Sequence, residues 1–231
     1  MAGSALAEPV QRTNVRPTVQ VAMEFIEVPS GEVTRLLSVE RLGRDGEKLR
    51  SELQMLIEQG KAAQTESMLV SSVSGQEATS ESALEVISPV EWEPPGLPGT
   101  FLPGPTHRDP KPDPLLPYPP VPTAFSTRAQ GNTLKFESSV GKDSRRVNLI
   151  LSPEIVFDAG TGRWPLRKGD PPLVEPYFYS LRTHSSITCS DGVPSLLGIL
   201  TPMTKAGTTS REQKLLVIVT ADIVSLGVPL K

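Results

Sequence analysis

The residues of this chain that could do chemistry are few, and their spacing assembles no catalytic group. Cys189 is the single cysteine, which excludes an internal disulfide and the usual thiol metal clusters. It lies in an alternating, strand-like stretch with only His184 near it in sequence, so we interpret it as a small buried residue and not as a reactive thiol. His107 and His184 alone cannot build a zinc site, and we predict no metal site.

Two further patterns also lack the spacing that catalysis requires. Gly160-Thr161-Gly162 begins like a phosphate-binding loop, but Pro165 stands where the third glycine belongs, so the pattern predicts a turn. Glu24 and Glu27 lie three residues apart on a predicted strand, which directs them to opposite faces and prevents acid–base pairing. The sequence therefore predicts a protein that is not an enzyme and that has no cofactor.

Composition narrows the class of protein further. The 231 residues carry a formal charge of -3, with an isoelectric point near 5.6, so no basic surface for nucleic acid is expected. Only 5% of residues are aromatic, and glycine and proline contribute 18 and 24 residues, which predicts a β-rich fold with long loops and a core of Val, Leu and Ile. Ala5-Leu6-Ala7 resembles a signal-peptidase site and predicts that a leader has been removed.

The first half of the chain shows two kinds of periodicity. After an N-terminal arm (1–17), apolar residues alternate with polar ones from Thr18 to Val28, as in a half-buried strand that ends at the turn Pro29-Ser30-Gly31. Between Asp45 and Ala63 the spacing changes to that of one amphipathic helix, which packs on a sheet or, alternatively, binds a partner. Strands near Met68–Val73 and Ala83–Ile87 then predict a hairpin across the turn 74–76.

A proline-rich segment interrupts the β pattern between Pro89 and Pro122, with 13 of the chain's 24 prolines. Each proline removes a backbone donor and fixes φ, so we expect an extended excursion, partly polyproline II, within a single β domain that spans 18–231. The alternative is a strap that docks onto a partner. Its candidate docking residues are Pro117, Tyr118, Pro119 and Pro120.

The second half predicts a meander followed by three more strands. Phe125–Arg128 and Leu134–Val140 flank a predicted turn near Gly131-Asn132, and Val147–Ser152 follows a turn at 141–143. The run from Ser186 to Leu200 indicates a strand, a turn and a strand, and Leu215–Val224 indicates a last strand.

Several of these segments resemble the secretin family, whose members form multimeric gated channels in bacterial outer membranes. The Val19–Val28 strand is similar to the family's opening strand, and the final strand, turn and strand with Leu215–Val224 are similar to its end. The residues that carry the resemblance are Glu27, Ser74, Gly75, Gln76, Gly131, Pro153, Asp191, Gly192, Gly198 and Thr220.

The chain departs from the family between Leu200 and Leu215. The family carries a gate-forming hairpin there, whereas this chain has a short polar link. The resemblance therefore implies a shortened, divergent member. Its expected fold is mainly β (α+β), with secretin-like antiparallel sheets or a sandwich, one amphipathic helix and a long proline-rich loop.

The resemblance also implies a place and a role. We expect a non-enzymatic bacterial envelope protein, in the periplasm or associated with the outer membrane. It would be a secretin-derived accessory component of type IV pilus or type II secretion machinery that acts by protein–protein assembly. The expected partners are other envelope, pilus or secretion proteins, or further copies of the chain, with no nucleic acid. The alternatives are a short outer-membrane secretin that forms an oligomeric pore, which would associate with the membrane, and an extracellular adhesion or binding domain.

Overall fold

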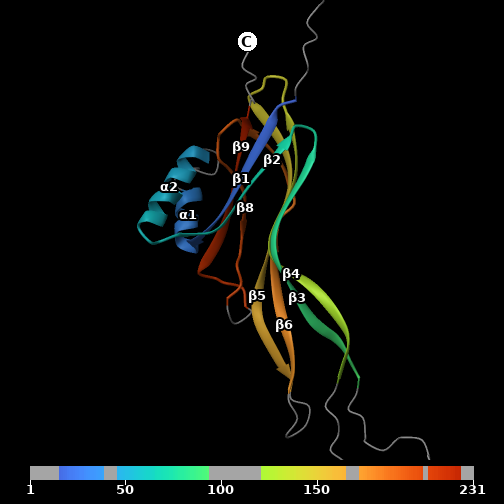
Figure 1. Cartoon of the computed structure of the whole chain (residues 1–231). Helices are drawn as coiled ribbons and strands as arrows, with labels where there is room; N and C mark the ends of the chain where they lie inside the picture. Colours follow the sequence, from blue (N-terminus) through green and yellow to red (C-terminus); the bar gives the residue numbers. More distant parts are fainter. Residues whose placement is uncertain (1–15, 39–45, 94–120, 165–171, 205–207, 225–231) are drawn as a thin grey trace, which may run out of the picture.

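The structure is a computed structural model that describes residues 16–38, 46–93, 121–164, 172–204 and 208–224. Two antiparallel sheets and a pair of helices make up most of this part of the chain (Figure 1). The helices are α1 (Ser30–Ser38) and α2 (Gly46–Glu58); the strands are β1 (Thr18–Pro29), β2 (Ala63–Val73), β3 (Glu77–Glu93), β4 (Val121–Val140), β5 (Arg146–Trp164), β6 (Leu173–Arg182), β7 (Ser185–Ser190), β8 (Ser195–Leu200) and β9 (Gln213–Val224). The predicted mainly β, antiparallel fold is confirmed.

The first sheet has the strand order β2-β1-β9-β8, so the N-terminal and C-terminal strands lie side by side at its centre. β1 and β9 pair over their whole length, from Thr18 opposite Val224 to Pro29 opposite Gln213. Because β1 alternates as the sequence predicts, its two faces are buried against different layers. Val19, Val21, Met23 and Phe25 face the second sheet, whereas Ile26 and Val28 face the helices.

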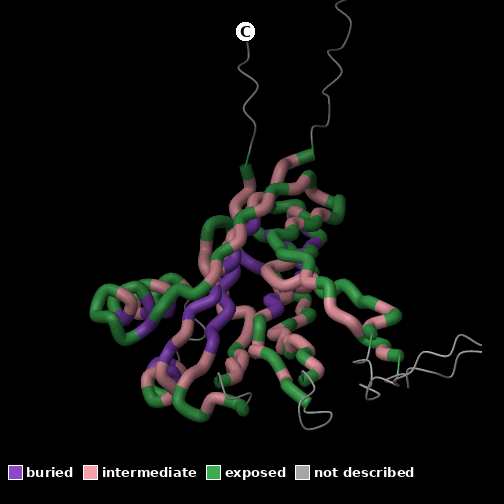
Figure 2. Tube along the Cα trace, turned by 60° about the horizontal axis from the view of Figure 1, so that its bottom comes forward, coloured by how far each residue is buried: buried purple, intermediate pink, exposed green. Residues whose placement is uncertain are grey.

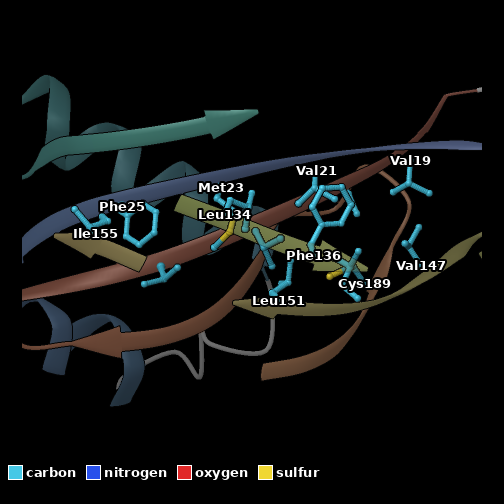
Figure 3. Close-up of a cluster of buried hydrophobic side chains, with 14 of the residues drawn as sticks. Val19, Val21, Met23, Phe25, Leu134, Phe136, Val147, Leu151, Ile155 and Cys189 are labelled. Carbon is cyan, nitrogen blue, oxygen red and sulfur yellow. The ribbon is translucent and has the colours of Figure 1, made fainter. Parts of the chain in front are cut away.

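The second sheet has the order β3-β4-β5-β6, with β7 paired to β5. The main core lies between the two sheets, and Figure 3 shows its side chains meeting from both. Phe25 and Met23 from β1 pack there with Leu134 and Phe136 from β4, all four at most 1% exposed. Figure 2 shows that the buried stretches gather in the middle of the molecule, while the far ends of the second sheet are intermediate or exposed.

Two helices, and not one, cover the outer face of the first sheet. α2 follows the predicted stripe and buries Leu49, Leu53 and Leu56. α1 was missed, because Pro29-Ser30-Gly31 is typical of a turn and the short α1 buries only Val33 and Leu36. The helix instead starts at Ser30, whose backbone N–H donates to the Glu212 carbonyl.

Two predicted turns are wrong in the same way, since the chain continues where the sequence suggests reversal. Gly131 lies inside β4, and Gly160-Thr161-Gly162 lies inside β5, where a register shift between Asp158 and Gly160 marks a bulge. The turn at 74–76 does exist, but it joins strands of different sheets. β2 pairs with β1 and β3 pairs with β4, so the predicted hairpin is wrong.

The long strands also reach into the proline-rich segment from both sides. β3 continues through Pro89 to Glu93, and β4 starts at Val121, with Pro122 opposite Trp92. Proline is tolerated there because β3 is an edge strand, which needs no donor on its outer side. Residues 94–120 lie outside the described residues. The strand β6 was not predicted.

The second sheet divides into two arms. β4 and β5 pair only as far as Gly131 opposite Val156, whereas β3–β4 pairing continues to Glu93 opposite Val121 and β5–β6 pairing to Trp164 opposite Leu173. We call residues 83–93 with 121–130 the first arm, and residues 157–164 with 173–180 the second arm. Figure 1 shows the two arms diverging below the sheets.

Candidate functional site

The turn at Ser74–Gln76 fastens one corner at which the chain passes from the first sheet to the second. The Ser74 backbone N–H donates to the Pro17 carbonyl at 2.9 Å, and the Ser74 hydroxyl accepts from the Val140 N–H at 3.0 Å. Gly75 has a φ of 84° and donates its N–H to the Ser138 carbonyl. These bonds tie the turn to both sheets, so Ser74 and Gly75 have a structural role, while the Gln76 N–H closes the turn by donating to the Val73 carbonyl.

A second corner lies at Asp191-Gly192, where the chain passes back from β7 to β8. The Asp191 N–H donates to the Arg145 carbonyl at 2.9 Å, while one Asp191 carboxylate oxygen accepts from the Ile223 N–H at 2.7 Å. Gly192, with a φ of 71°, donates to the Ala221 carbonyl. The structure thus brings resemblance residues to two corners that link the same two sheets.

The other resemblance residues lie within strands. Glu27 is on β1, Pro153 on β5, Gly198 on β8 and Thr220 on β9, and in the described strand pairings none of them lies opposite another. Gly131 lies at the fork between the arms with a φ of 144°, and a Cβ there would overlap the Ser82 carbonyl. The candidate docking residues Pro117, Tyr118, Pro119 and Pro120 lie outside the described residues.

The prediction of a buried Cys189 is confirmed, since the residue is 1% exposed in the core between the sheets. Burial raises the pKa of its thiol, and a hydrogen bond to Ser195 partly offsets that rise. Glu24 and Glu27 point to opposite faces, as predicted. Glu24 binds Arg50 of α2 through both carboxylate oxygens, at 2.7 and 2.8 Å, and so anchors the helix to the sheet.

One polar pair escaped the sequence analysis. The Ser152 hydroxyl lies 2.7 Å from His184 Nδ1, a contact between residues 32 positions apart that no local pattern signals. Within the described residues, no hydrogen bond joins a carboxylate to His184, so the arrangement lacks the third group that orients a catalytic histidine. No group of three or more metal-ligating side chains occurs in that part of the chain either.

A hollow with a volume of about 660 Å³ lies at the fork of the second sheet. Leu84 and Gln130 line it from the first arm, Phe157 and Tyr179 from the second arm, and Asn132 from the paired part of β4. Asn132 donates to the Glu66 carboxylate at 2.6 Å, which fixes one wall. Burial raises the pKa of Tyr179, and the negative charge of Glu27 raises it further, so its hydroxyl stays protonated at neutral pH and can donate.

Unpaired strand edges bound both sheets of the described chain. β2 and β8 bound the first sheet, and the second sheet is bounded by β3 on one side and by β6 and β7 on the other. β3 is 17 residues long, and both arms expose large apolar side chains. Leu84 and Ile87 are each 67% exposed, and Phe125 is 60% exposed. None of the described helices is long and apolar enough to span a membrane.

Comparison with known proteins gives similarities only among solved structures. No protein-family model matches the chain, and no curated protein matches it. The InvG secretin domain from the Salmonella SPI-1 injectisome is 8% identical, with a TM-score of 0.46, over 94% of this chain and 65% of that chain. The type II secretion system secretin GspD of E. coli K12 is 10% identical, with a TM-score of 0.45, over 90% of this chain and 50% of that one.

A third similar structure is the Klebsiella pneumoniae type II secretion system outer membrane complex of PulD, PulS and the PulC HR domain. The matched chain is 11% identical, with a TM-score of 0.47, over 91% of this chain and 40% of that one. This chain therefore spans between 40% and 65% of the length of these three neighbours. Because every TM-score is below 0.5, the functional proposal rests on the residues and edges of the chain itself.

Proposed function

We propose that this chain is a non-enzymatic, secretin-related component of the bacterial envelope that acts by assembly. It is a shortened, divergent relative without the gate hairpin, and it serves as an accessory part of type IV pilus or type II secretion machinery. Its partners are other envelope proteins or further copies of itself, reached through strand edges or through the proline strap.

The unpaired edge of β3 is the observation that carries this proposal. A strand edge presents a row of backbone N–H and C=O groups, to which another chain can add a strand. Among the described residues, no strand pairs with the outer edge of β3 over Glu77–Glu93, which extends far beyond the part of the sheet that the core supports. An exposed edge of this length is a liability in an isolated protein, and a partner that pairs with it would remove the liability.

The resemblance residues support the same proposal by their structural roles. Ser74, Gly75, Asp191 and Gly192 hold the two corners between the sheets, so the sequence likeness concerns how the sheets are connected and not a reactive site. The resemblance residues stabilise the connections between the sheets, and the exposed surface includes unpaired strand edges. Both features fit a protein that acts by assembly better than one that acts by catalysis.

Absolute mass by light scattering tests the assembly directly. We expect a defined oligomer in buffer, and a much smaller mass in a variant that carries Leu84→Lys and Ile87→Lys on the first arm, because added charge opposes strand pairing. Met55→Lys is the matched control, since Met55 is 43% exposed on α2, away from the free edges. A wild-type monomer at every concentration and with lipid would contradict the proposal and favour a free-standing binding domain.

An oligomeric pore is the second candidate, and the exposed apolar side chains of the first arm favour it. Ile87, Val90 and Phe125 are between 54% and 67% exposed, which is costly in water and favourable in lipid. Repeating the mass measurement with lipid vesicles separates the two candidates. A ring-sized species that floats with vesicles supports a pore, whereas an oligomer indifferent to lipid supports the accessory role.

A further inference from the structure

The hollow at the fork of the second sheet, which we call the fork hollow, takes its walls from both sheets. Glu66 comes from β2 of the first sheet, Asn132 from β4, and Phe157 and Tyr179 from β5 and β6. Glu66 lies opposite Phe25, and so shares the face that Phe25 turns to the second sheet. The volume of about 660 Å³ is that of a ligand pocket, which typically measures about 300–1,000 Å³.

Two carboxylates line the fork hollow, and each keeps one oxygen without a hydrogen-bond partner among the described residues. One Glu66 oxygen accepts from the Asn132 amide at 2.6 Å, and one Asp158 oxygen accepts from the Gly160 N–H at 2.7 Å. No described Lys or Arg forms an ion pair with either carboxylate, and none lines the hollow. The hollow therefore holds two negative charges that no described cation neutralises.

The arginines near the fork are engaged elsewhere. Arg128 lies two residues before Gln130, which lines the fork hollow, but the Arg128 guanidinium is 3.6 Å from the Glu154 carboxylate and borders a separate hollow. The Arg182 guanidinium lies 3.1 Å from the same Glu154 oxygen. Among the described residues, these two arginines are thus already paired with a carboxylate of their own chain.

A third carboxylate adds to the negative potential at the hollow. Burial raises the pKa of Tyr179, and the charge of Glu27 on β1 raises it further, so that charge acts on the Tyr179 hydroxyl. Glu27 likewise forms no ion pair with a described Lys or Arg. A negative potential that retains the phenol proton also favours a bound cation.

Two stacked rings give the hollow a surface suited to a planar cation. Phe157 and Tyr179 both line it, with ring centroids 4.8 Å apart and 16° between the ring planes. An aromatic face attracts any cation, but a guanidinium also stacks on it, whereas an ammonium is a compact and strongly hydrated charge. A guanidinium has five N–H donors in a fixed fork, so it can donate to two carboxylates at once.

We propose that the fork hollow binds an arginine side chain presented by another protein. Leu84 favours a polypeptide over free arginine, because it lines the same hollow and is 67% exposed. A backbone that carries the arginine would cover this apolar side chain, which a free amino acid would leave in water. The inference goes beyond the proposed function and does not depend on it, because the hollow exists in a single chain.

Short peptides test the assignment with the full chain. The probes are dye-labelled Ala-Ala-Arg-Ala-Ala and its citrulline and lysine analogues, and binding is measured by fluorescence anisotropy. Citrulline replaces the guanidinium by an uncharged group of the same shape. We expect the arginine peptide to bind at least about tenfold more tightly than the citrulline peptide, because hydrogen bonds between charged groups are the stronger ones. The lysine peptide should bind more weakly than the arginine peptide, since an ammonium lacks the planar fork.

Two variants locate the binding. Glu66→Gln and Asp158→Asn each remove one charge but keep an oxygen that can accept the hydrogen bond of the wall. We expect each to weaken binding of the arginine peptide about threefold, and the two together to remove most of its advantage over the citrulline peptide. Glu77→Gln is the matched control, because Glu77 pairs with Lys135 at 3.0 Å and does not line the hollow. That variant should bind the arginine peptide as the wild type does.

Three results would overturn the proposal. The first is equal binding of the arginine and citrulline peptides, or an affinity for the arginine peptide that neither variant lowers. The second is a lysine peptide that binds as tightly as the arginine peptide, which would assign the hollow to any positive charge. The third is a fall in the mass of the chain's own oligomer when the arginine peptide is added, which would assign the hollow to an arginine of a second copy.

Discussion

The Cys189 thiol lies in the core between the two sheets, opposite Val147 on β5. The alternation of the strand around it was enough to predict burial, because a period of two assigns each residue to a face. The Ser152–His184 pair could not be predicted in this way. It joins β5 to the residue just before β7, and a contact across 32 positions depends on a register that no local pattern contains.

Burial should make Cys189 unreactive in the folded protein. We expect a disulfide reagent to label it at least about a thousandfold more slowly in the native state than in denaturant, because reaction requires opening of the core. Burial also raises the pKa of the thiol, so the thiolate that reacts is scarce. Ser139→Cys in a Cys189→Ser background is the control, since Ser139 is exposed on β4. Equally rapid labelling at both positions would contradict the burial.

Tyr179 should make stability depend on pH in the alkaline range. Its pKa is raised by burial and by Glu27, so the folded state keeps the phenol proton to a higher pH than the unfolded state. The stabilisation is complete below the unfolded value of about 10 and is lost as pH rises through the folded value. Above about pH 10, we expect the urea midpoint of the Tyr179→Phe variant to depend less on pH than that of the wild type. Tyr177→Phe, at an exposed position of the same strand, is the comparison. An equal loss of pH dependence in that variant would show that the effect does not arise from the raised pKa of Tyr179.

At the scale of the element, glycine positions explain both the predicted turns that are confirmed and those that are wrong. Gly75 and Gly192 do end strands, as predicted, with positive φ at the corners. Gly131 and Gly160 also have positive φ, but each lies inside a long strand. Sequence shows where a backbone can leave the ordinary β region, but not whether it turns or bulges, because the neighbouring strand decides that.

Gly131 should be far less replaceable than Gly198. An alanine at 131 must adopt a φ of 144° and would place its Cβ 2.7 Å from Ala83 Cα, so we expect Gly131→Ala to lower the free energy of unfolding by about 2 kcal/mol or more. Gly198 has no heavy atom within 4 Å of an added Cβ, so Gly198→Ala should cost less than about 1 kcal/mol. Urea midpoints at unchanged slope give both values. Similar losses would show that the fork does not require glycine.

At the scale of the whole molecule, most elements other than α1 and β6 were predictable in their order, but the assignment of the strands to sheets was not. The turn at 74–76 looks like a hairpin, yet it carries the chain from the first sheet to the second, as the turn at 191–192 carries it back. Which sheet a strand joins is decided by pairing across long sequence distances, such as β1 with β9. Local turn chemistry does not encode that choice.

The same division into a packed centre and free arms should appear in hydrogen exchange. β4 provides its own control, because Leu134 and Phe136 are buried between the sheets whereas Phe125, further along the same strand, is 60% exposed. Local opening of the arm breaks few buried contacts, so its amides should exchange through a small opening free energy. We expect peptides from 121–130 to exchange at least about a hundredfold faster than peptides from 132–140. Equal protection along β4 in the isolated monomer would mean that the first arm is covered, and its exposed apolar face could not then be the surface through which this chain assembles.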